Sequence, residues 1–357
     1  MKKIGILTFH NTTNFGSFLQ TLALYKTVID LGYYVEIIDY RCENIEKKEL
    51  PSFFPDSLNP KDIIKFILFN PVKSRKYKQF KLALSEYFQL SDHFDRKTIK
   101  NATFPYDIYV VGSDILWDLE LTNYDFTYFL DFVEKGKKIA FSTSVGKQWT
   151  SEDADKIKPA LLEFDHIAIR ESGSAEWMSD YMGRKIETVC DPTMLVERTY
   201  WDNLASKSKL KNYSKPYVLV YFPDERIIRD ARKFALEKEM QVLVINYRML
   251  FLGVKNIRPY CIEDFLYLIK HAEMVFTSSY HGILFSLYFH TPFYLYFRDN
   301  SHNVRFESLI EKMKIDDRYR KDSDGVLDEE MDFSGIDKEI EKWRNESKEI
   351  LIDYICH

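Results

Sequence analysis

The stretch KIGILTFHNTTNFGSFLQTLALYKTVIDLGYYVEIIDY, residues 3–40, predicts a strand, a helix and a second strand. KIGILTF is a short apolar run of strand length. Residues 15–31 then place apolar side chains three and four positions apart, as on one face of a helix, and Gly32 follows as a stop signal. YVEIIDY returns to a strand pattern. This order is typical of parallel strands that are joined by helices.

The same alternation continues along the chain in two series. YDIYVVGSD, KKIAFSTS and HIAIRES each predict a strand that runs into a polar turn. After a long stretch rich in Lys, Ser and Asn, the second series has the strands PYVLVYF, QVLVINY, AEMVF and PFYLYF. Helical patterns separate them at residues 224–238, 263–271 and 281–289, and a strong helical pattern covers residues 336–355.

These patterns predict an α/β protein of two Rossmann-like domains that face each other across a cleft, an architecture called GT-B-like. We expect a first domain over residues 1–195, a linker over 196–214 and a second domain over 215–330. The tail, residues 331–357, is expected to form a helix that packs back on the first domain. A length of 357 residues suits two such domains.

Composition excludes several classes of protein. The net charge of −5 argues against a nucleic-acid binder. The four cysteines, Cys42, Cys190, Cys261 and Cys356, form no CxxC pair, and no His, Asp or Glu set has metal-ligand spacing, so we expect no metal site and no disulfide framework. The first apolar run is too short for a signal peptide, and no run approaches the ~18 residues of a membrane span. A cytoplasmic location is therefore expected.

Three polar turns follow strands in the first series. HNTTNFGSFLQ, residues 10–20, has the chemistry of a nucleotide or phosphate cradle, or is simply a turn with a helix cap. In VGSDILWD, residues 111–118, Gly112 allows close backbone approach, although a capped strand end would look the same. In IAIRESGS, Arg170 offers a guanidinium fork for a phosphate or carboxylate, unless it forms a surface pair with Glu171.

A fourth turn lies in TSSYHGILFS, residues 277–286, between a buried strand and a buried helix. The carboxyl end of a parallel strand, followed by a helix N-terminus, is where such folds bind anionic ligands. His281 can give or take a proton near neutral pH, although a lone histidine there is more often a core residue. Arg298, Asn303 and Arg305 follow the next strand and are expected to reach the same cleft.

Residues 61–84 form a basic segment with apolar side chains interleaved. Asp62 is its one acid, against Lys61, Lys65, Lys73, Arg75, Lys76, Lys78 and Lys81. This pattern indicates a peripheral contact with a membrane surface or an anionic partner. The alternative is a solvated helix that packs on its own domain.

Taken in order, NFGSFLQTLALYKTVIDLG, VGSDILW, IRE, SSYHG and NVRFESL resemble the motifs of the polysaccharide pyruvyl transferase family, over residues 14–309. The resemblance implies a GT-B-like enzyme, active in bacterial exopolysaccharide or capsule biosynthesis, that transfers pyruvate from phosphoenolpyruvate to a sugar as a ketal. Phosphoenolpyruvate is then a co-substrate, and no other cofactor is implied. The expected acceptor is a sugar of a glycan or of its undecaprenyl-diphosphate-linked precursor, met at the inner face of the membrane.

The resemblance also assigns roles to residues. His281 falls on the family's catalytic histidine and Arg170 on a donor-binding arginine. Some members carry an arginine where this chain has Ser279, so Arg298 or Arg305 is expected to supply that charge. The expected donor side is Arg170, Ser278, Ser279, Gly282, Arg298, Asn303 and Arg305. The expected acceptor side is Asn11, Asn14, Phe15, Gly16, Gln20, Gly112, Ser113, Asp114 and Trp117.

Two other functions fit the same sequence. One is a glycosyltransferase that uses a nucleotide sugar, for which Glu263 or Asp264 would bind the ribose. The other is a non-catalytic glycan-binding member of the family, indicated only by Ser279 in place of an arginine.

Overall fold

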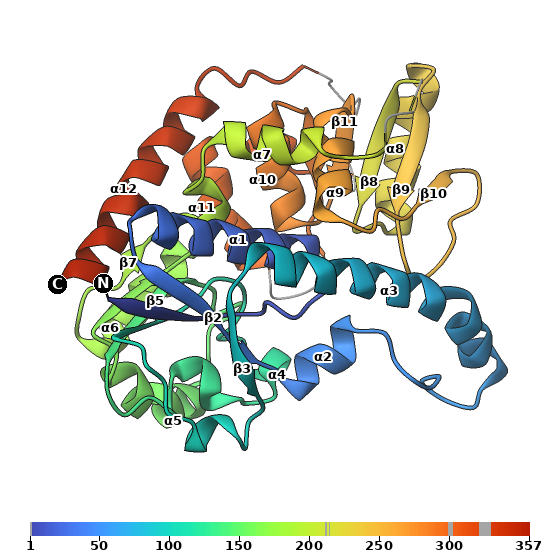
Figure 1. Cartoon of the computed structure of the whole chain (residues 1–357). Coiled ribbons are helices and arrows are strands. Elements are labelled where there is room, and N and C mark those ends of the chain that lie inside the picture. Colours follow the sequence, from blue (N-terminus) through green and yellow to red (C-terminus); the bar gives the residue numbers. More distant parts are fainter. Residues whose placement is uncertain (1, 211–212, 214, 299–302, 321–329) are drawn as a thin grey trace.

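The computed structural model describes residues 2–210, 213, 215–298, 303–320 and 330–357, and these form two α/β units (Figure 1). The first unit contains a seven-stranded sheet and the second a five-stranded sheet. All strand pairs recorded in both sheets are parallel. The predicted α/β fold with two parallel sheets is therefore confirmed.

The first sheet has the order β3-β2-β1-β4-β5-β6-β7. Its strands are β1 (Lys3–Leu7), β2 (Tyr34–Tyr40), β3 (Leu90–Phe94), β4 (Ile108–Val111), β5 (Lys137–Thr143), β6 (His166–Ile169) and β7 (Glu187–Thr188). The chain winds outward from β1 to β3 and then returns to place β4 on the other side of β1. The turns after β1 and β4 therefore open at the point where the winding direction reverses, which is where such sheets bind ligands.

The second sheet has the order β10-β9-β8-β11-β12. Its strands are β8 (Tyr217–Tyr221), β9 (Gln241–Ile245), β10 (Lys255–Ile257), β11 (Met274–Thr277) and β12 (Phe293–Leu295). The reversal of winding here lies between β8 and β11, so the turns after these two strands flank the corresponding crevice.

Helices cover the faces of both sheets. In the first unit they are α1 (Phe15–Asp30), α2 (Glu43–Glu49), α3 (Pro60–Tyr87), α4 (Leu119–Thr122), α5 (Ser151–Leu162) and α6 (Ser172–Met182). The later helices are α7 (Arg198–Ser206), α8 (Glu225–Glu237), α9 (Ile262–Lys270), α10 (Tyr280–Phe289), α11 (Val304–Met313) and α12 (Ile336–Cys356). None of the described helices combines the length and the apolar character that a bilayer crossing needs.

The strands that carry the motifs appear where the apolar runs predicted them, but three short strands do not follow from the pattern. β3, β7 and β10 are edge strands of five, two and three residues, with partly exposed side chains. The segment expected to be a linker, residues 196–214, contains helix α7, and its residues 211, 212 and 214 lie outside the described chain. Trp201 and Leu204 bury one face of α7 in the core, which explains why a polar-looking segment is helical.

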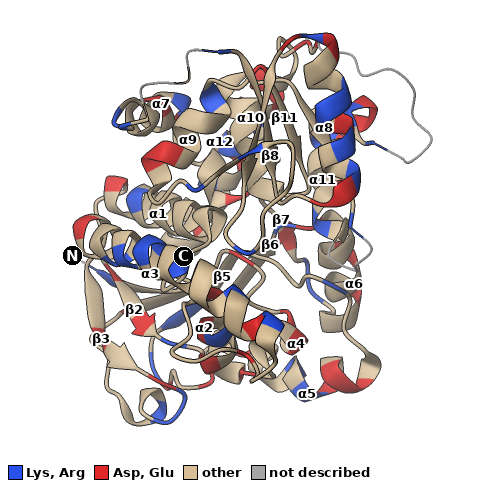
Figure 2. Ribbon diagram, turned by 90° about the vertical axis from the view of Figure 1, so that its right-hand side faces the viewer, with Lys and Arg blue, Asp and Glu red and all other residues tan. Residues whose placement is uncertain are grey.

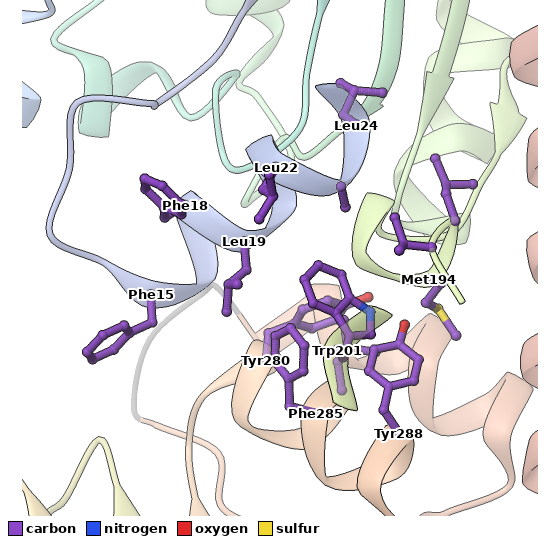
Figure 3. Close-up of a cluster of buried hydrophobic side chains, with 14 of the residues drawn as sticks. Phe15, Phe18, Leu19, Leu22, Leu24, Met194, Trp201, Tyr280, Phe285 and Tyr288 are labelled. Carbon is purple, nitrogen blue, oxygen red and sulfur yellow. The ribbon is translucent and has the colours of Figure 1, made fainter. Parts of the chain in front are cut away.

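An apolar interface joins the two units. Helix α1 of the first unit lies against α10 of the second, and Figure 3 shows buried aromatic and aliphatic side chains of both helices in one hydrophobic cluster. Phe15 stacks on Phe265 of α9 with ring centroids 4.6 Å apart, and Trp201 meets Phe285 edge to face. Because these side chains are fully buried, separating the units would expose a continuous part of the core.

The last helix returns to the first unit, so both chain ends lie close together (Figure 1). In α12, Arg344 donates to the carbonyl of Met194, and Tyr354 donates to the carbonyl of Ile167 in β6. Ser347 Oγ accepts a hydrogen bond from the Cys190 N–H. This helix therefore holds the stretch that follows β7, which carries part of the site described next.

Candidate functional site

A cavity of about 230 Å³ lies between the two units, at the carboxyl ends of their central strands. We call it the His281 cavity. The turns after β1, β4 and β11 and the first turn of α11 form most of its wall. Its described lining includes Phe9, Thr12, Asn14, Ser17, Lys48, Glu49, Asp114, Phe222, Ser278, Ser279, Tyr280, His281, Arg298, Asn303, Arg305 and Phe306.

His281 sits in the first turn of α10 and reaches across to helix α1. The Ser279 side chain caps α10 by accepting a hydrogen bond from the Gly282 N–H at 3.2 Å. An added Cβ on Gly16 would lie only 2.1 Å from His281 Nδ1. Gly16 is therefore required for the imidazole to approach the first unit this closely.

Asp191 is the buried partner of this histidine. Its Oδ2 lies 3.4 Å from His281 Nε2, longer than an ordinary hydrogen bond, and 2.8 Å from Arg170 Nη1. Oδ1 accepts hydrogen bonds from the Thr193 N–H and hydroxyl. Burial raises the pKa of the Asp191 carboxyl, but His281 and Arg170 lower it more, so the net pKa lies well below the usual range.

Sequence reasoning missed Asp191. Its signal was the CDPT turn, residues 190–193, which we placed at the end of the first domain without a function. The short strand β7 precedes it, and Asp191 caps a 3-10 helix that starts at Pro192. A carboxylate directly after a strand of a parallel sheet is a site candidate by position, but a two-residue strand gives too weak a pattern to find it.

Arg170 does not form the surface pair with Glu171 that we weighed as an alternative, because its side chain is 2 % exposed and pairs with Asp191. It is also absent from the described lining of the His281 cavity. This geometry does not support a direct contact between Arg170 and a donor, and the donor-binding role of Arg170 stays a prediction. Its position, behind Asp191 and 5.2 Å from the Tyr280 ring centroid, is that of a residue that fixes its neighbours.

Arg298 and Arg305 do line the cavity, as expected for the charge absent at Ser279. Burial, with Arg170 nearby, lowers the pKa of Arg305 to about 10, and its Nε has no hydrogen-bond partner in the described chain. Arg298 donates to Ser278 Oγ at 2.8 Å and to the Phe222 carbonyl. Guanidinium groups held in a shared cavity are suited to an anion with several oxygens.

The helix N-terminus at Gly282 does not offer the free donor that we expected. Its N–H is already bound by the Ser279 hydroxyl. Ser279 thus acts as a helix cap, and this role alone explains a serine at that position. Asn303, also expected on the donor side, lines the cavity and donates to the Arg298 carbonyl.

Of the residues assigned to the acceptor, Asn14 and Asp114 line the cavity and Gly16 borders it through His281. Asn14 caps helix α1 with its side-chain oxygen. Asp114 accepts a hydrogen bond from Ser17 and has a left-handed backbone, with φ of 80°. A non-glycine residue in that conformation is strained, and such strain is found preferentially at functional sites.

The other assigned acceptor residues lie behind the wall. Trp117 is fully buried and donates to the Tyr128 carbonyl, and Phe15 belongs to the interface with α9. Gln20 is buried and its Oε1 accepts from the Ser113 N–H, so it supports the turn after β4. The remaining residues are also absent from the described lining of the cavity: Asn11, Gly112 and Ser113. Sequence alone could not separate these supports from the cavity wall.

A comparison with models of protein families identifies the family of this chain. Residues 14–300 match the model of the polysaccharide pyruvyl transferase family. The chain belongs to this family. It is therefore a member of a transferase family whose acceptors are polysaccharide sugars. A comparison with curated proteins finds no match.

Solved structures share the fold. A UDP-N-acetylglucosamine 2-epimerase from Rickettsia bellii aligns over 99 % of this chain and 96 % of its own, with 9 % identity and a TM-score of 0.52. UGT89C1 from Arabidopsis thaliana aligns over 99 % of both chains, with 11 % identity and a TM-score of 0.51. A putative UDP-N-acetylglucosamine 2-epimerase from Listeria monocytogenes covers 98 % of this chain and 89 % of its own, with 11 % identity and a TM-score of 0.51. These likenesses confirm the GT-B-like fold.

The contact between Gly16 and His281 is testable by stability. Gly16→Ala should lower the free energy of unfolding by about 1–3 kcal/mol, because its Cβ would overlap the imidazole. Gly173→Ala is the matched control: it is also the second residue of a helix, and a Cβ there meets nothing within 4 Å. It should be neutral or stabilise by up to about 1 kcal/mol. Urea denaturation measures both, and equal effects would contradict the predicted contact.

Proposed function

We propose that the protein transfers the enolpyruvyl group of phosphoenolpyruvate to a sugar hydroxyl and closes a pyruvate ketal. Family membership supports the class of reaction. The observation that carries the proposal for this chain is the wall of the His281 cavity, where one histidine, 3.4 Å from a buried carboxylate, lines the same space as two arginines. Such a wall supplies both requirements of the reaction, a proton donor and a clamp for a dense anion.

Arg305 and Arg298 hold the donor in this proposal. Phosphoenolpyruvate carries a carboxylate and a phosphate, and each presents oxygens that a guanidinium can bind in pairs. No carboxylate in the described chain forms an ion pair with Arg305, and its half-buried position strengthens its attraction for an incoming anion. Arg170 stays a positioning residue, because its charge is matched by Asp191.

His281 is the proton donor. Its ring lines the cavity, with Nε2 3.4 Å from Asp191 Oδ2 and Nδ1 against Gly16 of α1. Protonation of the enol methylene makes the adjacent carbon electrophilic, and a sugar hydroxyl adds to it. A second hydroxyl then replaces the phosphate, which leaves with the electron pair of its C–O bond. One hydroxyl proton restores His281 and the other leaves with the phosphate.

Replacement of His281 tests the acid directly. His281→Ala should lower kcat by about 10²–10⁴-fold, the usual contribution of a positioned acid or base. The melting temperature should stay near that of the native protein. His271→Ala, an exposed histidine at the end of α9, should leave kcat unchanged. Native-like turnover by the His281 variant would end the assignment.

Replacement of Arg305 tests the clamp. Arg305→Ala should raise KM for phosphoenolpyruvate by about tenfold or more, since a charged hydrogen bond contributes about 1.5–3 kcal/mol. Arg229→Ala, on the exposed face of α8, is the control and should leave KM unchanged. Steady-state kinetics with varied donor gives both constants. An unchanged KM in the Arg305 variant would remove that residue from the donor site.

A glycosyltransferase with a nucleotide-sugar donor is less well supported. Glu263 accepts a hydrogen bond from Tyr87, and Asp264 accepts one from Ser208. Neither belongs to the described lining of the His281 cavity. The two carboxylates that could have bound a ribose are therefore used in packing α9 against α3 and the stretch after α7.

The same proposal includes a peripheral contact with an anionic membrane through the first half of α3 and the loop before it. Large apolar side chains are exposed there, and Phe53 is 92 % exposed. The others are Phe54, Leu58, Ile64, Ile67 and Leu68. Lys61 and Lys65 are exposed beside them, and Figure 2 shows further basic residues along α3. Apolar side chains flanked by lysines are the composition that anionic bilayer surfaces bind.

Co-sedimentation with vesicles tests this contact. The protein should bind vesicles rich in phosphatidylglycerol. Salt should release it, because salt screens the attraction between the lysines and the anionic lipids. The double substitution Phe54→Glu and Ile67→Glu should reduce binding at least about tenfold, since each removes an exposed apolar side chain that the bilayer would bury. Leu236→Glu, at an equally exposed site on α8, should not. Equal binding by the two variants, or none by the native protein, would remove the proposal.

A further inference from the structure

A second cavity, of about 310 Å³, adjoins the His281 cavity and has a different composition. We call it the Lys76 cavity. It lies at the carboxyl ends of β8 and β9, where α3 and the end of α2 from the first unit close over the second sheet. The two cavities share Asn14, Glu49, Phe222 and Arg298. Nothing in the proposed reaction at His281 requires this space.

Lys76 is the unusual residue of this wall. Its side chain is 7 % exposed, and within the described chain its ammonium forms no ion pair or hydrogen bond. Instead, Nζ lies 3.9 Å from the centroids of two aromatic rings, Phe15 of the first unit and Tyr247 of the second. Aromatic faces replace only part of the hydration that a buried ammonium loses, so the site favours an anionic partner.

Other residues of the cavity wall also favour an anionic ligand. Lys73, Arg248 and Arg298 also line the cavity, and Glu49 is the one acid in its described lining. Burial raises the pKa of the Glu49 carboxyl, which favours its neutral, hydrogen-bond-donating form beside an anion. Asn246 is buried and lines the cavity, and its Nδ2 has no hydrogen-bond partner in the described chain. Lys76 and the Asn246 amide thus present donors that have no acceptor in the described chain.

We propose that the Lys76 cavity binds the diphosphate group of a diphosphate ester. Lys73, Lys76 and Arg248 line this cavity and not the His281 cavity, and three basic side chains exceed what one carboxylate would need. The apolar and aromatic part of the lining, which includes Phe222, Tyr247, Met249 and Phe251, suits the organic group of such an ester. A flat nucleoside and a prenyl chain both have this chemistry, and the experiment below separates them.

The shared wall gives this cavity a place in the proposed function, on which this part of the inference rests. A sugar attached to a diphosphate held by Lys76 would pass Arg298 and Asn14 and enter the His281 cavity. The diphosphate would then anchor the acceptor, while His281 and Arg305 handle the donor. Binding of diphosphate itself does not depend on this role.

Calorimetric titration with inorganic pyrophosphate is the first test. The native protein should bind it, and Lys76→Met should weaken binding about tenfold or more, as loss of one charged contact does. Lys78→Met is the matched control, since this lysine is exposed two residues further along α3. Arg248→Ala is a second variant and should also weaken binding. Because the Arg248 side chain is exposed, its removal should not unfold the protein, so weaker binding would not be due to misfolding.

Two variants of the other cavity keep the hypotheses apart. His281→Ala and Arg305→Ala should bind pyrophosphate as the native protein does, whether or not they transfer pyruvate. If Arg305→Ala abolishes pyrophosphate binding and Lys76→Met does not, the anion occupies the His281 cavity and the inference is overturned. If pyrophosphate binds at Lys76 but no ketal is formed, the proposed reaction fails and the binding site stands.

The protonation of Lys76 adds an independent readout. Burial lowers the pKa of Lys76 to about 7, with Arg248 acting in the same direction and Glu49 opposing. At pH 8 the free amine is therefore largely neutral, and a bound anion should restore its proton. Titrations in buffers of different ionisation enthalpy should show proton uptake that Lys76→Met abolishes. If proton uptake persists in Lys76→Met, another group such as Glu49 takes up the proton. That result would contradict the role of Lys76.

UDP and farnesyl diphosphate then identify the organic group. Tighter binding of UDP than of pyrophosphate would indicate a nucleoside diphosphate, and tighter binding of farnesyl diphosphate a polyprenyl diphosphate. In either case the gain should persist in Lys78→Met and fall in Lys76→Met. If neither ester binds more tightly than pyrophosphate, the aromatic wall does not recognise an organic group and the ester part of the inference is overturned.

Discussion

One buried negative charge organises the site. Asp191 has no exposure to solvent, and its carboxylate stays charged because Arg170 binds it on one side and His281 approaches it on the other. Arg170 follows β6 of the first sheet, whereas His281 lies in the first turn of α10 of the second unit. An isolated charge at this depth would be strongly unfavourable, so the carboxylate depends mainly on Arg170, which donates to it at 2.8 Å, while His281 approaches it at 3.4 Å.

The packing of the two units follows from this arrangement. His281 can meet Asp191 only if α10 lies against α1, and the apolar interface around Phe15, Phe265 and Phe285 keeps it there. Gly16 has no side chain, whereas a Cβ at this position would overlap the imidazole. The apolar side chains of the interface thus hold the units together. Its polar contact, between His281 and Asp191, belongs to the candidate functional site. The two adjoining cavities occupy the part of the boundary that this packing leaves open.

The sequence predicted the architecture well because long apolar runs decide it. Strands β1, β4, β5, β8 and β9 are fully or largely buried, and their runs of apolar residues have one reasonable interpretation. The short edge strands β3, β7 and β10 have no such run.

The site was predicted in part: His281, Arg298 and Arg305 lie together as their positions after β11 and β12 suggested. Trp117 and Gln20 share the same turns, but a one-dimensional pattern does not show which side chains turn inward. Asp191 was missed because its importance comes from partners 21 and 90 positions away in the chain.

The contact between Ser347 of α12 and the backbone of Cys190 has a consequence for how the protein forms during synthesis. The stretch that carries Asp191 is held by a helix 157 positions later in the chain. While the ribosome is still making the second unit, the first sheet has all its strands but lacks this brace, and His281 has not yet been translated when Asp191 emerges. The nascent first unit must therefore hold an unbraced acidic turn, and contacts of such long range form slowly. Synthesis of the last helix is the step that completes the site, so slow translation or a chaperone bound to the first unit would matter most before α12 is made.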